Sequence, residues 1–132
     1  MRVVLDTNVF VAGLLTQGVA AQVLDLWLKG RYTLLTSSQQ MRELRRVLRQ
    51  KFPELPRAKV GRLLNLLEGL AEKVTVRTAP EVSSDEDDNL ILAIALKGRA
   101  DFLVTGDKSH LLGIKVHGVR VIGVREFLER MR

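Results

Sequence analysis

Four carboxylates stand at positions where the ends of parallel strands would bring them together. Asp6 directly follows the apolar run 2–5, and Asp107 follows the apolar run 102–105. Glu43 lies in the second turn of the helix predicted after the second strand, and Asp88 lies in the first turns of another predicted helix. Ligands of open α/β sheets collect at the carboxyl ends of the strands. The pattern therefore predicts one acidic site formed by these four residues.

Such a group of carboxylates calls for a cation, because neighbouring carboxylates repel one another and cannot all ionise cheaply. The chain has no cysteine and only two histidines, His110 and His117. Oxygen ligands would therefore hold the metal, which favours Mg²⁺ or Mn²⁺. Two such ions, roughly 3.5–4 Å apart, activate a water and stabilise the leaving oxygen of a phosphodiester. This chemistry needs no imidazole or thiol.

Each acid also has a plainer interpretation. An acid after a strand, such as Asp6, is often a turn former or a helix cap. Asp85 to Asp87 suit the positive end of a helix dipole. Asp88 differs because it aligns with the apolar stripe of its own helix, where a carboxylate is costly unless it is paired or metal-bound. Short polar residues near the acids are candidates to orient them or to hold water: Thr7, Asn8, Asn89 and Thr105.

Positive charge is concentrated in one part of the chain. The net charge is +6, and residues 29–62 hold ten Lys and Arg against two acids. Arg42, Arg46 and Arg49 are spaced i, i+4 and i+7, so they share one helix face and are predicted to contact backbone phosphates. Glu43 lies among them, and an ion pair with Arg42 or Arg46 is the alternative to a role as metal ligand.

The elements that must position these residues alternate between strands and helices. Strands are predicted at 2–5, 32–36, 73–76, 102–105 and 120–122. Helices are predicted at 10–15, 19–29, from Ser37 to about 51, from Pro56 to 70, from Ser83 to 97 and at 124–131. Ser37 with Gln40, and Ser83 with Glu86, have the spacing of capping boxes. This order predicts a three-layer α/β/α fold with a mainly parallel sheet of four to five strands.

The 132 residues suit one domain, residues 1–132, with 46% hydrophobic and 27% charged residues. No apolar run approaches the roughly 20 residues of a membrane span, and the N-terminus does not read as a secretory signal. We therefore expect a cytoplasmic protein.

At this point the sequence resembles the PIN-domain ribonuclease family. The opening VVLDTNVFVAGLL is similar to the first strand and Asp-Thr-Asn signature of that family, and SSDEDDNLILAIA, FLVTGDKSHLL and VRVIGVREFLERM follow in the family's order. The resemblance is greatest to a small bacterial branch described as toxin components of toxin–antitoxin pairs. It implies a single-strand endoribonuclease with Mg²⁺ or Mn²⁺, whose acidic site is Asp6, Glu43, Asp88 and Asp107.

The resemblance also has consequences for partners. Some relatives place another acid two or three residues after Asp107, where this chain has Ser109 and His110, so the second metal position is weaker here. Relatives are often dimers, and the apolar helices at 19–29 and 60–70 exceed what one small sheet covers. We therefore expect a homodimer, with an antitoxin protein as a further partner.

Two alternatives to a toxin ribonuclease remain open. One is a non-catalytic RNA-binding module, which explains the basic region but not four convergent acids, and which would want more aromatic residues than 5%. The other is a housekeeping RNA-processing nuclease that has no antitoxin.

Overall fold

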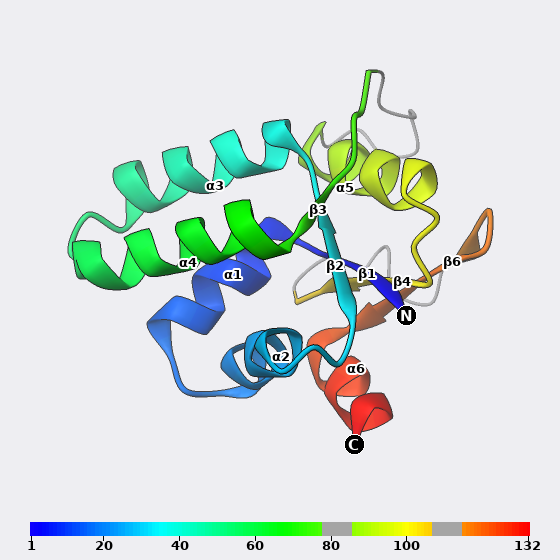
Figure 1. The fold of residues 1–132 in the computed structure, drawn as a ribbon, viewed down its shortest axis with the longest axis horizontal. Coiled ribbons are helices and arrows are strands. Elements are labelled where there is room, and N and C mark those ends of the chain that lie inside the picture. Colours follow the sequence, from blue (N-terminus) through cyan, green and yellow to red (C-terminus); the bar gives the residue numbers. More distant parts are fainter. Residues whose placement is uncertain (78–85, 107–114) are drawn as a thin grey trace.

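A six-stranded sheet forms the centre of the computed structural model, which describes residues 1–77, 86–106 and 115–132 (Figure 1). The strand order is β3-β2-β1-β4-β6-β5, and all neighbours pair in parallel except β5 with β6. The predicted mainly parallel sheet in an α/β/α fold is confirmed. The strands are β1 (Arg2–Leu5), β2 (Thr33–Thr36), β3 (Glu72–Lys73), β4 (Phe102–Thr105), β5 (Lys115–Val116) and β6 (Val119–Gly123).

The helices lie close to the predicted positions, with differences at their ends. They are α1 (Thr7–Leu15), α2 (Val19–Leu28), α3 (Ser38–Lys51), α4 (Arg57–Leu70), α5 (Glu86–Lys97) and α6 (Val124–Met131). α1 begins three residues earlier than predicted, because Asp6 caps it directly at the end of β1. The chain leaves α2 through Gly30, whose φ of +76° glycine adopts without strain.

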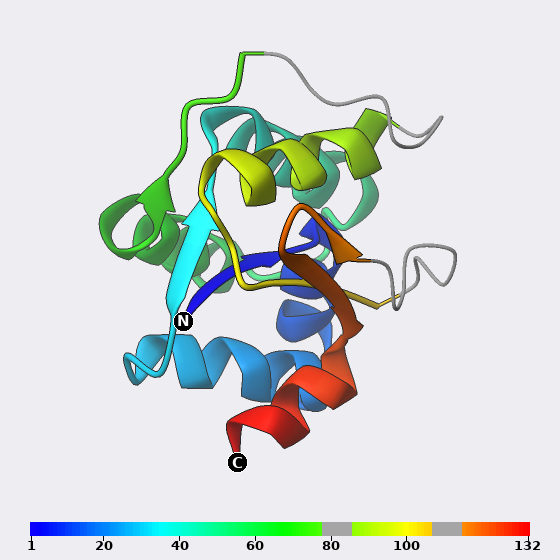
Figure 2. The same cartoon turned by 90° about the vertical axis from the view of Figure 1, so that its right-hand side faces the viewer.

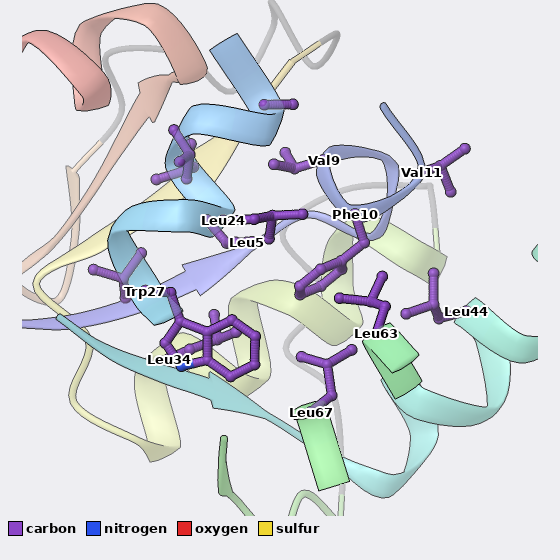
Figure 3. Close-up of a cluster of buried hydrophobic side chains, with 14 of the residues drawn as sticks. Leu5, Val9, Phe10, Val11, Leu24, Trp27, Leu34, Leu44, Leu63 and Leu67 are labelled. Carbon is purple, nitrogen blue, oxygen red and sulfur yellow. The ribbon is translucent and has the colours of Figure 1, made fainter. Parts of the chain in front are cut away.

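Side chains of alternate strand residues point to opposite faces of the sheet and pack into two separate cores. Val3 and Leu5 face the larger core, which α1, α2, α3, α4 and α6 cover (Figure 3). Val4, Leu35 and Leu103 face the smaller core, to which α5 contributes its apolar residues. Figure 2 shows the resulting layers, with α5 on one side of the sheet and α2 and α6 on the other. Parallel strands buried on both faces are nearly continuous in apolar residues, as these are.

The third strand is shorter than predicted. The expectation was 73–76, whereas β3 contains only Glu72 and Lys73. Val74 continues the contact by donating its backbone N–H to the carbonyl of Thr36 at 2.7 Å, and the side chains of Val74 and Val76 are buried against α5. Val74 and Val76 are therefore buried as in a strand, but strand pairing ends because β2 ends at Thr36.

None of the helices in the described residues is by itself long and apolar enough to cross a membrane. α1 and α2 meet that test of length and composition only as a pair, bent by 104° between them.

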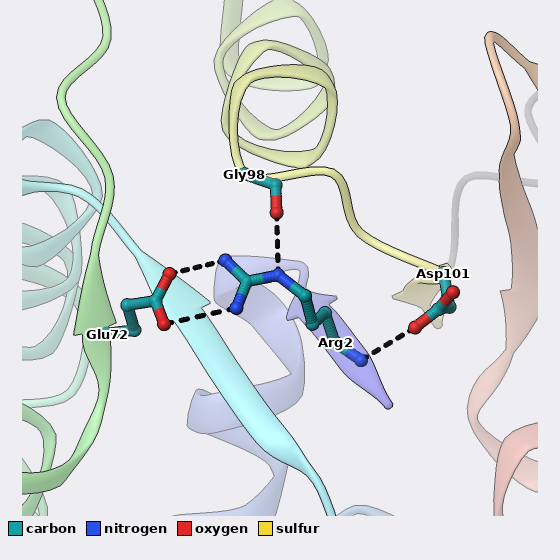
Figure 4. Close-up of polar contacts among 4 residues, drawn as sticks. All are labelled: Arg2, Glu72, Gly98 and Asp101. Carbon is teal, nitrogen blue, oxygen red and sulfur yellow. Dashed lines mark hydrogen bonds and ion pairs between the residues drawn. The ribbon is translucent and has the colours of Figure 1, made fainter.

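Arg2 joins four elements at the amino end of the sheet (Figure 4). Its guanidinium makes a two-pronged ion pair with Glu72 of β3, and its Nε donates to the carbonyl of Gly98 at 2.8 Å, just after α5. Its backbone N–H donates to Oδ2 of Asp101 at 2.8 Å, just before β4. The C-terminal end of α5 is therefore fixed beside the start of β1.

The Arg2–Glu72 pair leads to a prediction about acid stability. The hydrogen bond from Arg2 lowers the pKa of Glu72 below its ordinary value of 4.5. A carboxyl group whose pKa is lowered in the folded protein adds to the free energy of unfolding at pH values above its ordinary pKa. This contribution is lost as the pH falls through the pKa of the folded state. Glu72→Gln should therefore lose less stability than the wild type between neutral pH and pH well below 4.5. Because half of Glu72 is exposed, the difference should be at most about 1 kcal/mol.

Urea unfolding at both pH values measures this difference. Glu129→Gln, which removes one exposed carboxylate from α6, is the control for a change of net charge. An acid-induced loss in Glu72→Gln equal to that of the wild type would show that the pair does not stabilise the fold.

Candidate active site

Asp6 lies where β1 passes into α1, and its carboxylate is held on both oxygens. The backbone N–H of Asn8 donates to Oδ1 at 3.4 Å, as expected for a helix cap. The hydroxyl of Thr105, at the end of neighbouring β4, donates to Oδ2 at 2.9 Å. Asp6 is only 4% exposed. The cap interpretation is therefore correct as far as it goes, but a cap does not require the second contact, which orients the carboxylate across two strands.

Gln40 links the ends of two strands to α3. Its Nε2 donates to the carbonyl of Leu5 at 2.8 Å, and its Oε1 accepts from the hydroxyl of Thr36 at 2.7 Å. The predicted capping box is half right, because the hydroxyl of Ser37 does accept from the backbone N–H of Gln40 at 3.1 Å. The side chain of Gln40, however, bonds to β1 and β2. The first turn of α3 is therefore fixed to the residue that precedes Asp6.

A cleft of about 330 Å³ opens beside Asp6, and Glu43 lines it from the next turn of α3. Glu43 is half-buried, and the cations Arg46 and Lys51 line the same cleft. The structure thus brings together two of the four predicted acids, one at the β1–α1 junction and one on α3, with two positive side chains at one place. The lining residues are Asp6, Thr7, Asn8, Val11, Ala12, Leu15, Glu43, Arg46, Val47, Lys51 and Phe52.

Asp88 is placed by the direction of α5. The C-terminal end of this helix is fixed beside Arg2, at the amino end of the sheet. Twelve residues of helix span roughly 18 Å, so the first turn, which contains Asp88, lies toward the edge where Asp6 stands. The buried stripe used to single out Asp88 is less selective than expected, because Ile91 to Ala95 are all buried. Asn89, which follows Asp88 in the sequence and was also predicted as a supporting residue, is buried.

The remaining acid, Asp107, lies outside the described residues, as do His110 and the Ser83–Glu86 capping box, which includes the undescribed Ser83. β4 leads toward Asp107 through Thr105 and Gly106. Within the described ranges, no group of three or more His, Asp or Glu side chains lies close enough to hold a metal ion. The four-acid site thus remains a prediction, of which Asp6 and Glu43 are placed together.

The three predicted phosphate contacts separate into different surroundings. Arg42, Arg46 and Arg49 are all exposed on α3, as their spacing required. Arg46 lines the cleft with Asp6 and Glu43. Arg49 instead lines a second groove, between α3 and α4, together with Arg45 and Arg57. Arg45 forms an ion pair with Glu68 of α4 at 3.0 Å. Helical spacing found the exposed face but could not show which arginine borders the acids.

Other site features were partly visible in the sequence. Thr7 and Asn8 line the cleft, and Thr105 is fully buried with its hydroxyl on Asp6. Lys51, at the end of α3, could not be singled out from its spacing, and Gln40 was predicted only as part of a helix cap. A polar residue at the third position of a helix that follows a buried strand was the available signal for Gln40.

The donor set of the cleft fits a hard divalent cation. Mg²⁺ and Mn²⁺ prefer carboxylate oxygen ligands. Two carboxylates from separate elements line one cleft, and Thr105 fixes the orientation of the Asp6 carboxylate in the way that outer contacts orient metal ligands.

Comparison with known proteins identifies the family of this sequence. The family described as "PIN domain" matches residues 2–109. A curated relative, the uncharacterized protein MJ1680 of Methanocaldococcus jannaschii, is 28% identical over 114 residues, which cover 82% of this chain and 72% of the relative.

The Gln40 contacts predict a measurable coupling with Thr36. Gln40 is 1% exposed, so Gln40→Leu leaves buried polar groups without their partner and should lower the free energy of unfolding by about 1–3 kcal/mol. In a Thr36→Val background, the same change should cost less, because the hydroxyl is already absent. Urea unfolding of the two single variants and the double variant gives the coupling, expected at about 0.5–3 kcal/mol.

Gln22→Leu makes the same substitution on the exposed face of α2 and should change stability by no more than about 0.5 kcal/mol. Strictly additive effects of Thr36→Val and Gln40→Leu would contradict the proposed link.

Proposed function

The chain belongs to the PIN-domain family, whose members are generally nucleases, and on this premise we propose that it cleaves phosphodiester bonds of single-stranded RNA with the help of Mg²⁺ or Mn²⁺. One observation carries the proposal. The cleft combines two carboxylates, Asp6 and Glu43, with two cations, Arg46 and Lys51. Carboxylates suit a divalent ion, and the cations suit the phosphates of a polyanion.

Each residue of the cleft has a separate role in the proposed reaction. Asp6 and Glu43 would hold the divalent ion, and Asp88 and Asp107 would complete the acidic set. When bound, the ion supplies Lewis acidity toward a phosphoryl oxygen and lowers the pKa of water. Thr105 keeps the Asp6 carboxylate in one orientation through its 2.9 Å hydrogen bond. Arg46 and Lys51 neutralise phosphate charge beside the acids, so the strand enters without meeting unscreened repulsion.

The proposal extends to the biological role and the partners of the protein. We propose a cytoplasmic toxin component that acts as a homodimer and is held inactive by an antitoxin, on the resemblance of the sequence to that branch. A housekeeping RNA-processing nuclease would use the same cleft without an antitoxin. A gene for a small antitoxin beside the gene of this protein, and co-purification of the two products, would distinguish the toxin from the housekeeping enzyme.

The role of Asp6 is tested with Asp6→Asn. Asparagine can still cap α1 through its carbonyl oxygen, and its Nδ2 can then donate to the hydroxyl of Thr105, so the metal-free fold should keep its stability. The variant loses a charged ligand, so Mg²⁺ should raise its Tm less than it raises that of the wild type. At a free ion concentration of 100 Kd, the wild-type gain is about 2.7 kcal/mol. Thermal melts with Mg²⁺ and with chelator, together with cleavage of a labelled single-stranded RNA, measure both effects.

Asp25→Asn, on the exposed face of α2, is the matched control and should keep both the Mg²⁺ shift and the cleavage. An Asp6→Asn protein that cleaves RNA at the wild-type rate, or keeps the full Mg²⁺ shift, would contradict the assignment of Asp6 to the active site.

Arg46 should contribute to RNA affinity through phosphate contact alone. Arg46→Ala is expected to weaken binding of all single-stranded sequences alike and to reduce the slope of log K against log salt by about one. Arg120→Ala, at an exposed position of β6 beside the start of β4, is the control and should leave the slope unchanged. Titrations of labelled RNA at several salt concentrations measure the slope. Equal slopes for the wild type and Arg46→Ala would show that Arg46 does not contact a phosphate of the RNA.

A further inference from the structure

The cleft beside Asp6 has an apolar end that the metal chemistry does not use. Five of its lining residues carry no polar side-chain group: Val11, Ala12, Leu15, Val47 and Phe52. Leu15 is 45% exposed at the C-terminal end of α1. A single exposed leucine on a surface is ordinary, but this one borders the cavity that also contains Asp6 and Glu43. Leu15 and Phe52 stand at the C-terminal ends of α1 and α3, nine residues beyond Asp6 and Glu43, so the apolar residues and Lys51 lie at the end of the cavity away from the two acids.

Phe52 supplies the aromatic surface of this apolar end. It is the residue at which α3 stops, it is half-buried, and it lines both the cleft and the α3–α4 groove. The residue before it is Lys51, which lines the cleft as well. An aromatic ring next to a cation is the combination with which proteins hold a base and its backbone in single-stranded nucleic acids.

The apolar wall is held in place before any ligand binds. Nζ of Lys59, in the first turn of α4, donates to the carbonyl of Leu14 at 2.6 Å. This places a cation at the C-terminal end of α1, where helix dipoles favour positive charge. The contact ties α4 to α1 directly beside Leu15. A preformed wall reduces the ordering that binding would otherwise require.

We propose that the apolar end of the cleft is a nucleobase-binding subsite. One unpaired base of the RNA stacks on Phe52 and packs against Leu15, while Lys51 and Arg46 contact phosphates that connect it to the nucleotide at Asp6 and Glu43. This inference rests on the proposed nuclease function and names the part of the substrate that the cleft recognises. A volume of about 330 Å³ lies at the small end of ligand cavities, about 300–1,000 Å³, which suits one nucleotide better than a helix.

Stacking has a consequence for the substrate. A base inside a duplex is already stacked and paired, so it cannot enter the subsite without being unpaired first. The enzyme would therefore require at least one unpaired base beside the scissile phosphate, and it would accept several bases, because every base has a face that can stack.

Removal of single bases from the RNA tests the subsite directly. The probe is a short unstructured oligoribonucleotide of mixed sequence, prepared as a series with one abasic position in each member. Binding is measured with the Asp6→Asn protein, which keeps the probe intact. One position in the series, next to the cleavage site of the wild-type enzyme, should bind about fivefold to 150-fold more weakly than the complete strand. The other positions should change affinity much less.

Protein variants identify the residues that hold the base. In the Asp6→Asn background, Leu15→Ala and Phe52→Ala should weaken binding of the complete strand, and the sensitive abasic position should lose its effect in Phe52→Ala. Leu28→Ala is the matched control, since Leu28 is 44% exposed on α2 and does not line the cleft. Phe52→Tyr keeps the ring and should bind as the parent does. If Phe52→Ala does not fold, the abasic series and Leu15→Ala decide.

The outcomes separate this inference from the function on which it rests. A wild-type protein that neither binds nor cleaves RNA would overturn the nuclease proposal. A protein that cleaves RNA, but shows a flat abasic series and unchanged binding by Leu15→Ala, would overturn the base subsite alone. Equal losses from Leu15→Ala and the Leu28→Ala control would do the same.

Discussion

The side-chain amide of Gln40 is the contact on which the geometry of the cleft depends. It holds the carbonyl of Leu5 and the hydroxyl of Thr36 within 2.8 Å, in a position that is almost closed to water. Leu5 precedes Asp6, and Gln40 precedes Glu43 by less than one helical turn. A buried polar network is costly unless its members are paired, so α3 cannot slide along β1 without breaking it. The position of Glu43 relative to Asp6 therefore depends on an uncharged side chain that joins α3 to the end of β1.

The opposite end of the sheet has a comparable constraint, and it determines where α5 begins. Arg2 binds the carbonyl of Gly98 and the carboxylate of Glu72, so the end of α5 and the edge strand β3 are held at the start of β1. A rigid helix fixed at one end has its other end placed by its length. The contact at Arg2 thus positions Asp88 toward the carboxyl edge from the far side of the sheet. Two polar contacts, one at each edge, align the elements that carry three of the four predicted acids.

Local patterns were sufficient for the elements and insufficient for some contacts between them. Short apolar runs located the strands, and Asp6 could be recognised because it follows one directly. β3 was predicted too long because strand length depends on the partner strand, and β2 ends at Thr36. Gln40 was recognised only as a cap, since its true partners lie on strands that are 35 and four residues away in sequence. The helical spacing of Arg46 and Arg49 predicted one shared face. The packing of α4 against α3 instead places Arg49 in a second groove, and spacing alone could not show this.

The charges of the cleft are compatible with the proposed binding of a polyanion at an acidic site. Asp6 lies deep, at 4% exposure, whereas Arg46 and Lys51 are exposed at the same cavity. In the proposed function, an approaching phosphate would meet positive charge first, and the two cations would offset the two carboxylates before a divalent ion binds. Lys59 bonds to the carbonyl of Leu14 and does not add its charge to the cavity lining. Attraction at the rim is compatible with the proposed metal ligands because Asp6 lies at the start of α1, whereas Arg46 and Lys51 lie on later turns of α3 than Glu43.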